Sequence, residues 1–197
     1  MPKGVPLTPE EQDRRRHEIF EASMKLFIKQ GFPETSMREV AAAVGIGKST
    51  LYDYFRTKDE ILIWGIEDIA MDLTVMARET AALPLPAAER LRKVMREHVA
   101  ALDARKEFYL RLSFEVQRLS LKAQKRIQVR RHEYQDVVAQ LIAEGIREGS
   151  FRNVDPLPVA RMMIVATTPT IFTSRPSGTP QQMLDETLDV VLRGLRA

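Results

Sequence analysis

The sequence predicts an all-α protein built from two helical domains. Apolar residues recur at spacings of three and four along most of the chain, and no stretch alternates apolar and polar residues for long, as a half-buried strand would. Four Ser/Thr-x-x-Glu/Gln patterns mark helix starts, because such residues satisfy the free N–H groups of a first helical turn. We expect about nine helices, divided between an N-terminal domain over residues 1–60 and a C-terminal domain over residues 61–197.

Capping patterns, glycine and proline indicate where each helix begins and ends. The four N-terminal patterns begin at Thr8, Ser36, Thr57 and Thr179. Residues 1–7 are then expected to form a loose arm, and Gly31 to end the first helix. A long helix from about 58 to 82 is broken by the Leu-Pro-Leu-Pro run at 83–86. Further helices are expected over about 87–104, 106–119, 121–148, 156–173 with a kink at Pro169, and 180–195.

Composition excludes several classes of protein. The 197 residues are 44% hydrophobic and contain no cysteine, and the three histidines, at 17, 98 and 132, are too far apart to indicate a zinc motif. No phosphate-cradling glycine loop or nucleophile elbow is present, so we expect no metal site, no cofactor and no catalytic residues. No leader and no uninterrupted apolar run of about 18 residues is visible, which predicts a cytoplasmic protein without a membrane span.

The residues at 40–55 have the pattern of a helix-turn-helix. Ala41 is small enough for a second helix to pass close by, and Gly45, four residues later, suits a turn that needs a positive φ. Leu51 and Phe55, again four apart, would anchor the second helix to the core. Its opposite face would then be free to enter a DNA major groove. The alternative interpretation is a helical hairpin in a core, with Tyr52 and Tyr54 as packing aromatics.

Residues 35–62 closely resemble the DNA-binding signature of the TetR family of transcriptional regulators. The specific features are the Thr-Leu-Tyr-x-Tyr-Phe run at 50–55, the lysine three residues after that phenylalanine, and the Ala-x-x-x-Gly turn before it. The resemblance implies that DNA is contacted by Thr35, Ser36, Lys48, Thr50, Tyr52, Tyr54 and Lys58. The outward face of the second helix adds Ser49 and Asp53 as candidates. Base-edge contacts specify sequence, so Lys48, Ser49, Thr50 and Asp53 are the candidates for specificity.

Two features depart from the common pattern of that family. Gly47 stands where serine is frequent and Ser49 where glycine is frequent. Glycine at the N-cap costs only a few tenths of a kcal/mol relative to serine, so the helix should still form. Asp53 is repelled by phosphates unless it accepts from a cytosine amino group; alternatively it faces solvent or pairs with Arg56.

The C-terminal domain gives weaker signals. In the TetR family the last two long helices pair with those of a second subunit, and the stripe on the final helix suits that burial, although it could equally face the chain's own core. The residues predicted at the dimer interface are Leu184, Leu188, Val191, Leu192 and Leu195. Those predicted to line a ligand cavity, unless they are ordinary core, are Trp64, Met71, Phe108, Tyr109, Phe114, Tyr134, Met162 and Phe172.

The net charge gives little indication of whether the protein binds nucleic acid. The chain carries +3, and residues 1–60 hold ten Lys and Arg against ten Asp and Glu, so phosphate affinity depends on how the charges are arranged. Residues 117–132 contain six basic and no acidic side chains. This stretch is either a solvated face or a surface that attracts flanking operator phosphates or an anionic ligand such as an acyl thioester.

The sequence thus predicts a ligand-responsive transcription regulator. The resemblance implies a repressor that binds palindromic operator DNA as a homodimer and is released by a small effector, which the sequence does not identify. A tilt of the helix after Thr57 would couple the two events. Two alternatives stay open at this point, namely a helical adaptor that binds another protein and a DNA-binding activator without a small ligand.

Overall fold

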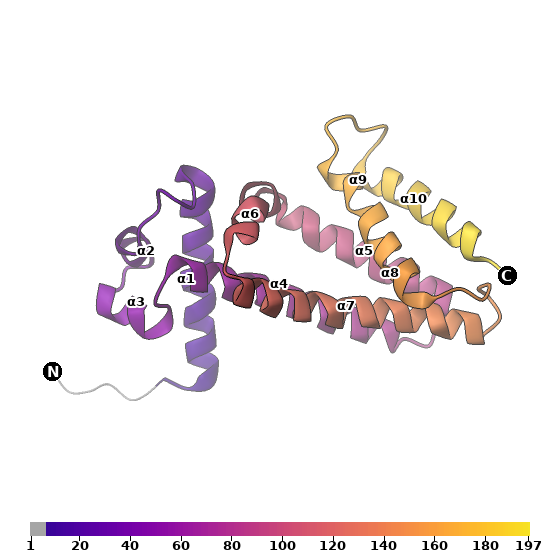
Figure 1. Cartoon of the computed structure of the whole chain (residues 1–197), viewed down its shortest axis with the longest axis horizontal. Coiled ribbons are helices and arrows are strands. Elements are labelled where there is room, and N and C mark those ends of the chain that lie inside the picture. Colours follow the sequence, from indigo (N-terminus) through magenta and orange to yellow (C-terminus); the bar gives the residue numbers. More distant parts are fainter. Residues whose placement is uncertain (1–6) are drawn as a thin grey trace. The chain divides into compact units, whose positions relative to one another are not determined.

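The computed structural model describes residues 7–197, which form ten helices and no strand (Figure 1). The expected loose arm over residues 1–7 lies, apart from Leu7, outside the described residues. The helices are α1 (Pro9–Gln30), α2 (Met37–Val44), α3 (Lys48–Tyr54), α4 (Lys58–Ala81), α5 (Ala87–Ala104), α6 (Lys106–Arg118), α7 (Leu121–Arg147), α8 (Pro156–Thr167), α9 (Pro169–Phe172) and α10 (Pro180–Leu195).

Helix starts lie where the capping patterns predict them. Thr8, Ser36 and Thr179 each accept a hydrogen bond from the N–H three residues on, and the Glu or Gln at that position accepts one in return. At the fourth pattern the Thr57 hydroxyl accepts from the Glu60 N–H at 3.1 Å. The Glu60 carboxylate, however, accepts from the N–H one residue before the expected cap, so this box is only half formed.

Proline divides the expected helix over 156–173 into two. Helix α8 ends at Thr167 and α9 begins at Pro169, which accounts for a tenth helix where about nine are predicted. Pro169 has no N–H to donate to the carbonyl four residues earlier, and its ring clashes with that turn. The predicted kink is therefore a break in the helix.

The chain forms two compact units, each built from separate stretches of sequence. The first contains the residues up to Glu67 together with Arg111–Gln124, and the second contains Asp68–Leu110 and Lys125–Ala197. Helices α4, α6 and α7 each run from one unit into the other. The boundary predicted at residue 60 differs from this division, because the last turns before Glu67 pack in the first unit.

The core of the first unit gathers around Trp64. The indole ring makes edge contacts with His17, Phe20 and Phe55, at centroid distances of 4.8, 5.9 and 6.0 Å. Phe20 lies so close to α4 that a Cβ at Gly65 would be 1.9 Å from its ring. Helix α4 thus needs glycine at this position to approach α1.

In the second unit α10 packs on α5, α8 and α9. Leu184, Leu188, Leu192 and Leu195 form the buried stripe of α10, and Ala160, Met163 and Thr167 are the fully buried residues of α8. The predicted amphipathic pattern of the last helix is confirmed, and it is buried against helices of its own chain.

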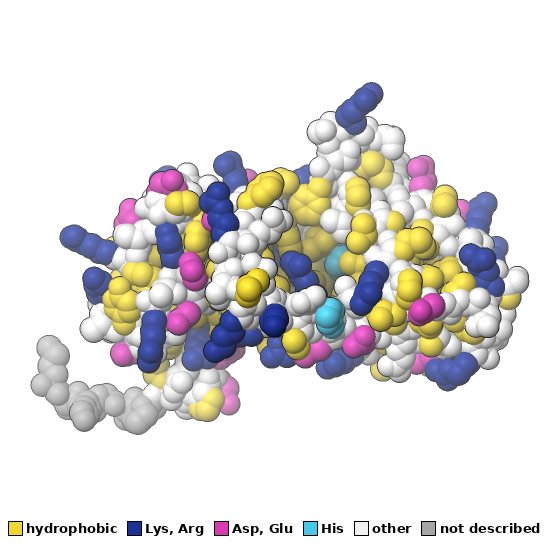
Figure 2. Space-filling view, viewed as in Figure 1, with side chains coloured by type: hydrophobic (Ala, Val, Ile, Leu, Met, Phe, Trp, Pro, Cys, Tyr) yellow, Lys and Arg dark blue, Asp and Glu magenta, His cyan; other side chains and the backbone are white. Residues whose placement is uncertain are grey.

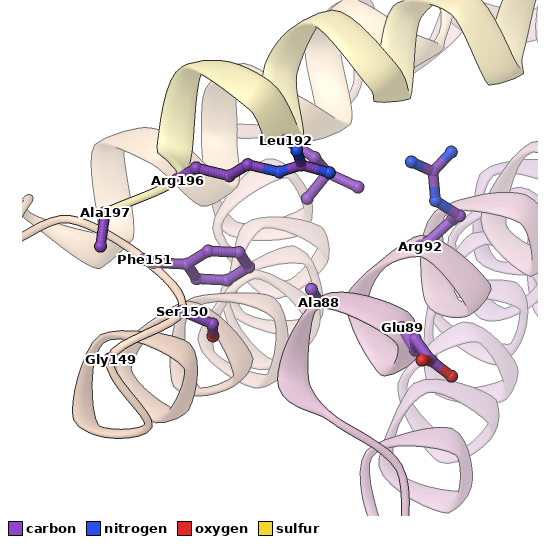
Figure 3. Close-up of a pocket in the computed structure, with 9 residues that line it drawn as sticks. All are labelled: Ala88, Glu89, Arg92, Gly149, Ser150, Phe151, Leu192, Arg196 and Ala197. Atoms are coloured by element: carbon purple, nitrogen blue, oxygen red, sulfur yellow. The ribbon is translucent and has the colours of Figure 1, made fainter.

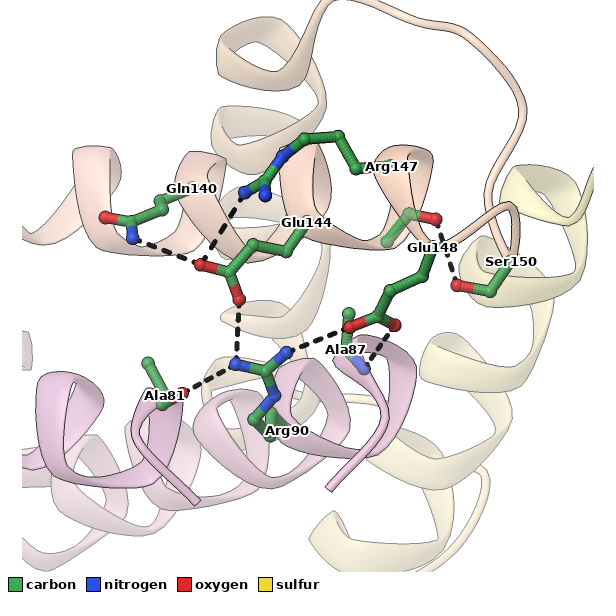
Figure 4. A network of polar contacts seen from close by, with 9 residues as sticks. Ala81, Ala87, Arg90, Gln140, Glu144, Arg147, Glu148 and Ser150 are labelled. Carbon is green, nitrogen blue, oxygen red and sulfur yellow. Dashed lines mark hydrogen bonds and ion pairs between the residues drawn. The ribbon is translucent and has the colours of Figure 1, made fainter. Parts of the chain in front are cut away.

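A buried arginine ties three helices of the second unit together (Figure 4). The Arg90 guanidinium on α5 donates to the Ala81 carbonyl at the end of α4 at 2.7 Å, and to Glu144 and Glu148 on α7 at 2.7 and 3.2 Å. The second oxygen of Glu148 accepts from the Ala87 N–H that opens α5, at 3.0 Å. The two carboxylates therefore neutralise the buried cation and fix the link between α4 and α5.

Among residues 7–197, none of the helices combines the length and the apolar character that crossing a bilayer requires.

Candidate nucleic-acid interface and regulatory domain

Helix α3 presents one exposed polar face. Leu51 and Phe55 are buried, as the helix-turn-helix pattern predicts, and they fix the helix against the first unit. The side chains that do not face the first unit are exposed, and Ser49 and Asp53 lie about half a turn from Leu51. The exposed side chains are Lys48, Ser49, Thr50, Tyr52 and Asp53, with the half-buried Tyr54 at the end.

The turn before α3 has the geometry that the sequence predicts. Ala41 is buried in α2, and Gly45 takes a left-handed φ of 73° at the end of that helix. Gly47 is the N-cap of α3 and gives no side-chain cap, yet the helix begins at the next residue, as expected for a glycine that costs little there. The turn therefore orients α3 through its backbone.

The side chains of the α3 face are free for a partner. No hydrogen bond or ion pair within residues 7–197 engages Lys48, Ser49, Thr50 or Asp53. The Lys48 ammonium lies 5.6 Å from the centroid of the Tyr52 ring, a cation–π contact that holds the two together at the surface. Asp53 makes no ion pair with Arg56, which removes that alternative and leaves solvent or a DNA base as its partner.

Lys58 has an internal role in the structure. Its ammonium donates to the backbone carbonyls of Phe32, Pro33 and Thr35, at 2.5, 2.7 and 3.2 Å, and lies 4.8 Å from the Phe32 ring centroid. All three donors of the ammonium are then used. Lys58 thus fixes the α1–α2 link to the start of α4, and the predicted phosphate contact would have to replace one of these bonds.

The side chains of Thr35 and Ser36 differ in their exposure to solvent. Thr35 is buried, and its hydroxyl donates to the Gly31 carbonyl at 2.7 Å, so the predicted DNA contact through its side chain would require this bond to open. Ser36 is exposed, and its hydroxyl caps α2 by accepting from the Glu39 N–H and donating to the Glu39 carboxylate. Hydrogen bonds from Ser36 lower the pKa of the Glu39 carboxyl. Ser36 stays a candidate contact.

The predicted dimer residues are mostly internal. Leu184, Leu188, Leu192 and Leu195 are buried within the single chain, and Val191 is half-buried, so a subunit interface at these residues stays a prediction. A helical stripe indicates burial but not the partner that buries it. The large apolar residues that α8 and α10 leave exposed are Met162, Val165 and Val190.

The predicted ligand residues are divided between the two units. Trp64 belongs to the core of the first unit, and Met71, Phe114 and Met162 are 45, 69 and 51% exposed, so a ligand role for these four stays a prediction. In the second unit Tyr109 contacts Phe108 and Phe172 edge to face, at 5.4 and 6.2 Å, and Tyr134 is buried.

A cleft of about 420 Å³ lies in the second unit where α5 begins and α10 ends (Figure 3). The Phe151 ring and the guanidinium groups of Arg92 and Arg196 line it. None of the predicted ligand residues takes part. Arg92 is 3.9 Å from Asp189, so part of its charge is already compensated.

Sequence reasoning missed two groups of buried polar residues in the second unit. One is the Arg90 network, and the other is a stacked pair formed by His98 and Tyr134, of which the sequence suggests only the tyrosine. A charged or imidazole side chain on the apolar face of a predicted helix is the signal that points to such groups.

The basic stretch over residues 117–132 is partly paired. Arg118 is 3.5 Å from Glu115 and Arg130 is 3.2 Å from Glu133. Lys and Arg side chains are spread over the visible face of the chain instead of gathering there (Figure 2). These pairs favour a solvated face.

Two family models match the chain. One, described as "Bacterial regulatory proteins, tetR family", matches residues 19–63, and the other, described as "Tetracyclin repressor-like, C-terminal domain", matches residues 84–195, more than half of the chain. Together they cover the helices that carry the α3 face and nearly all of the second unit.

Similar proteins extend over the whole chain. The transcriptional repressor KstR2 of Mycolicibacterium smegmatis is 26% identical over 202 residues, which cover 97% of this chain and 95% of that protein. The structure of PfmR from Thermus thermophilus is 26% identical with a TM-score of 0.73, over 91% of this chain and 99% of that one. The structure of AibR with isovaleryl coenzyme A and operator DNA is 26% identical with a TM-score of 0.67, over 89% and 97%.

Replacing Lys58 should destabilise the first unit. In Lys58→Met three backbone carbonyls lose their donor, which we expect to lower the free energy of unfolding by about 1–3 kcal/mol. Urea unfolding of the full chain, followed by Trp64 fluorescence, measures it. Lys48→Met is the matched control, because its ammonium makes no hydrogen bond, and a change below about 0.5 kcal/mol is expected there. Equal stability of the two variants would contradict the structural role of Lys58.

Proposed function

Since the chain belongs to the TetR family of bacterial regulatory proteins, we propose that it is a repressor that binds a two-fold operator as a homodimer in the cytoplasm and is released by a small molecule. The observation that carries the proposal is the exposed face of α3, whose polar side chains are unpaired while Leu51 and Phe55 anchor the helix from behind. Such a helix suits entry into a major groove.

The similar proteins support both parts of the proposal, namely repression through an operator and release by a small molecule. KstR2 is named as a repressor, and AibR was solved with an acyl coenzyme A and operator DNA together. We extend this to the present chain as an effector that carries an acyl group, such as an acyl thioester. The first unit would meet the DNA, and the helices of the second unit would hold the effector.

Lys48 and Thr50 should set sequence preference. Both are exposed on α3, and neither side chain has a hydrogen bond or ion pair within residues 7–197, so removing either removes a base-edge or nearby phosphate contact. We expect Lys48→Ala or Thr50→Ala to weaken binding to the best sequence by about 5- to 150-fold, on the basis of 1–3 kcal/mol for a specific contact, and to broaden preference. Enrichment of random duplexes by the wild type and each variant, followed by mobility-shift titration, measures both effects.

The control for that experiment is Arg175→Ala. Arg175 is an exposed cation in the link between α9 and α10, so its loss changes net charge as Lys48→Ala does without touching α3. It should leave the enriched sequence unchanged. If Lys48→Ala and Arg175→Ala enrich the same sequence with the same affinity, α3 is not the recognition helix.

We assign the dimer surface to the exposed faces of α8 and α10. Pro158, Met162 and Val165 are exposed at spacings of four and three along α8, and Val190 and Gly194 are exposed four apart on α10. A Cβ at Gly194 would meet nothing within 4 Å, so this part of α10 offers room for a partner helix. Two such helices from each subunit would make a four-helix bundle.

Charges on this surface should dissociate the dimer. In the variant with Val165→Asp and Val190→Asp, two carboxylates enter an apolar interface, and we expect the dissociation constant to rise at least about 100-fold because each buried unpaired charge costs several kcal/mol. Sedimentation equilibrium measures it, and circular dichroism checks that the monomer keeps its helices. Leu121→Asp is the control, since Leu121 is 77% exposed outside this surface. A variant that remains a dimer like the control would place the interface elsewhere.

Effector and operator should bind antagonistically. Helix α4 belongs to both units. A change in the orientation of its part in the second unit therefore also changes its part in the first unit. Linkage requires that the operator weaken effector binding by the factor by which the effector weakens operator binding, typically 5- to 150-fold for about 1–3 kcal/mol. Calorimetric titration with isovaleryl, octanoyl and palmitoyl coenzyme A, with and without the enriched duplex, measures it. Equal affinities in both titrations for each compound that binds would contradict induction by acyl thioesters.

A further inference from the structure

The second unit contains a buried pair of aromatic rings whose polar atoms have no partner. His98 on α5 and Tyr134 on α7 stack with their planes 19° apart and their centroids 5.2 Å apart, and each residue is 5% exposed. Both ring nitrogens of His98 and the hydroxyl of Tyr134 lack a hydrogen-bond partner among residues 7–197. Three unpaired polar atoms thus meet in one pair of side chains.

Such a cluster is costly without a partner. Most buried polar side-chain atoms in folded proteins have at least one hydrogen bond, and an orphaned group loses its hydration without compensation. Phenylalanine at both positions would fill similar space without that cost. The cluster therefore points to a state of the protein in which another molecule supplies the missing partners.

Both side chains are uncharged at neutral pH. Burial lowers the pKa of His98 to about 4, so the ring offers one N–H donor and one nitrogen acceptor. Burial, reinforced by the nearby Glu97 carboxylate, raises the pKa of Tyr134, so its hydroxyl keeps its proton. Two donors are then available to a single acceptor atom.

The nearest charged group does not serve this pair. Glu97 accepts from the Thr80 hydroxyl at 2.7 Å and from the Lys93 ammonium at 2.5 Å, so its two oxygens are already engaged. Its negative charge disfavours a second anion beside Tyr134. No hydrogen bond or cation–π contact within residues 7–197 joins a Lys or Arg side chain to the pair, so nothing there favours a carboxylate or phosphate over an uncharged oxygen.

The surroundings of the pair are apolar. One helical turn from His98 lie Val94 and Leu102, and one turn from Tyr134 lies Val138, all buried. A ligand that reaches the pair would therefore place hydrocarbon against these side chains and a single polar atom against the two rings.

We propose that His98 and Tyr134 together bind the uncharged oxygen of an otherwise apolar small molecule, a carbonyl that accepts from both rings. The inference rests on the proposed function, because it places this pair at the effector site of the second unit. It adds the chemical class that the site selects, namely a neutral oxygen-bearing hydrocarbon in preference to a plain hydrocarbon or a carboxylate.

The test compares three matched probes on the full-length protein: 2-decanone, decane and decanoate. Intrinsic fluorescence titration should give the wild type at least about tenfold tighter binding of 2-decanone than of decane or decanoate, as one or two hydrogen bonds to a buried partner provide. Tyr134→Phe and His98→Phe should each reduce this preference, and the double variant should abolish it. His132→Phe, at an exposed histidine on α7, should keep it. Equal binding of 2-decanone and decane to the wild type, or no binding of 2-decanone, would overturn the proposal.

A second measurement needs no ligand. Tyr134→Phe removes one oxygen that has no partner, so the free protein should be as stable as the wild type or more stable in urea unfolding. A clear loss of stability would show that the hydroxyl is already bonded, and would equally overturn the proposal.

Operator binding separates this inference from the proposed function. If the wild type selects no duplex, the proposed function fails whatever the probes do. If it selects an operator and releases it with an acyl compound, yet does not distinguish 2-decanone from decane, the inference on His98 and Tyr134 fails alone.

Discussion

A helix leaves its first N–H groups and its last carbonyl groups without partners inside the helix, and an all-α protein must satisfy them at every end. Here the partners come from a few local side chains. Thr8, Ser36 and Thr179 cap three helices from within the next turn, and Gly45 closes α2 by taking a left-handed φ. The position of α3 depends on that closure, because its own N-cap is a glycine without a side chain.

Lys58 satisfies carbonyls in the same way at longer range. The link between α1 and α2 lies outside both helices. The Lys58 ammonium, on the first residue of α4, donates to three backbone carbonyls of this link. A lysine at this position therefore stabilises the module that presents α3, whether or not it also meets a phosphate. Mutations that weaken DNA binding through Lys58 would report on the fold of the first unit, whereas those at Lys48 would report on recognition.

The range of these interactions explains what the sequence could predict. Proline breaks and capping side chains act within four residues. The bounds of α5, which follows the prolines at 84 and 86, and of α10, which Thr179 caps, therefore agree with the predicted 87–104 and 180–195. The face of α3 was predictable too, since Leu51 and Phe55 mark its buried side. Which helices cover an apolar stripe depends on residues far away in the sequence. For this reason the leucines of α10 were assigned to a second subunit although they pack inside the chain. The carbonyl partners of Lys58, 23–26 residues away, are hidden from local patterns for the same reason.

The second unit contains two kinds of buried polar group, and the difference between them bears on function. Arg90 finds two carboxylates and a carbonyl inside the chain, so its charge is compensated by the fold itself and only its Nε lacks a hydrogen-bond partner among residues 7–197. His98 and Tyr134 find nothing comparable, and each unpaired atom lowers stability by about 1–3 kcal/mol in the free protein. A molecule that brings a neutral oxygen to the pair relieves that cost, while a hydrocarbon of equal size leaves it in place. Selectivity for the oxygen then arises from the instability of the empty site, and the same free energy is available to bias the helices α5 and α7 toward the bound arrangement.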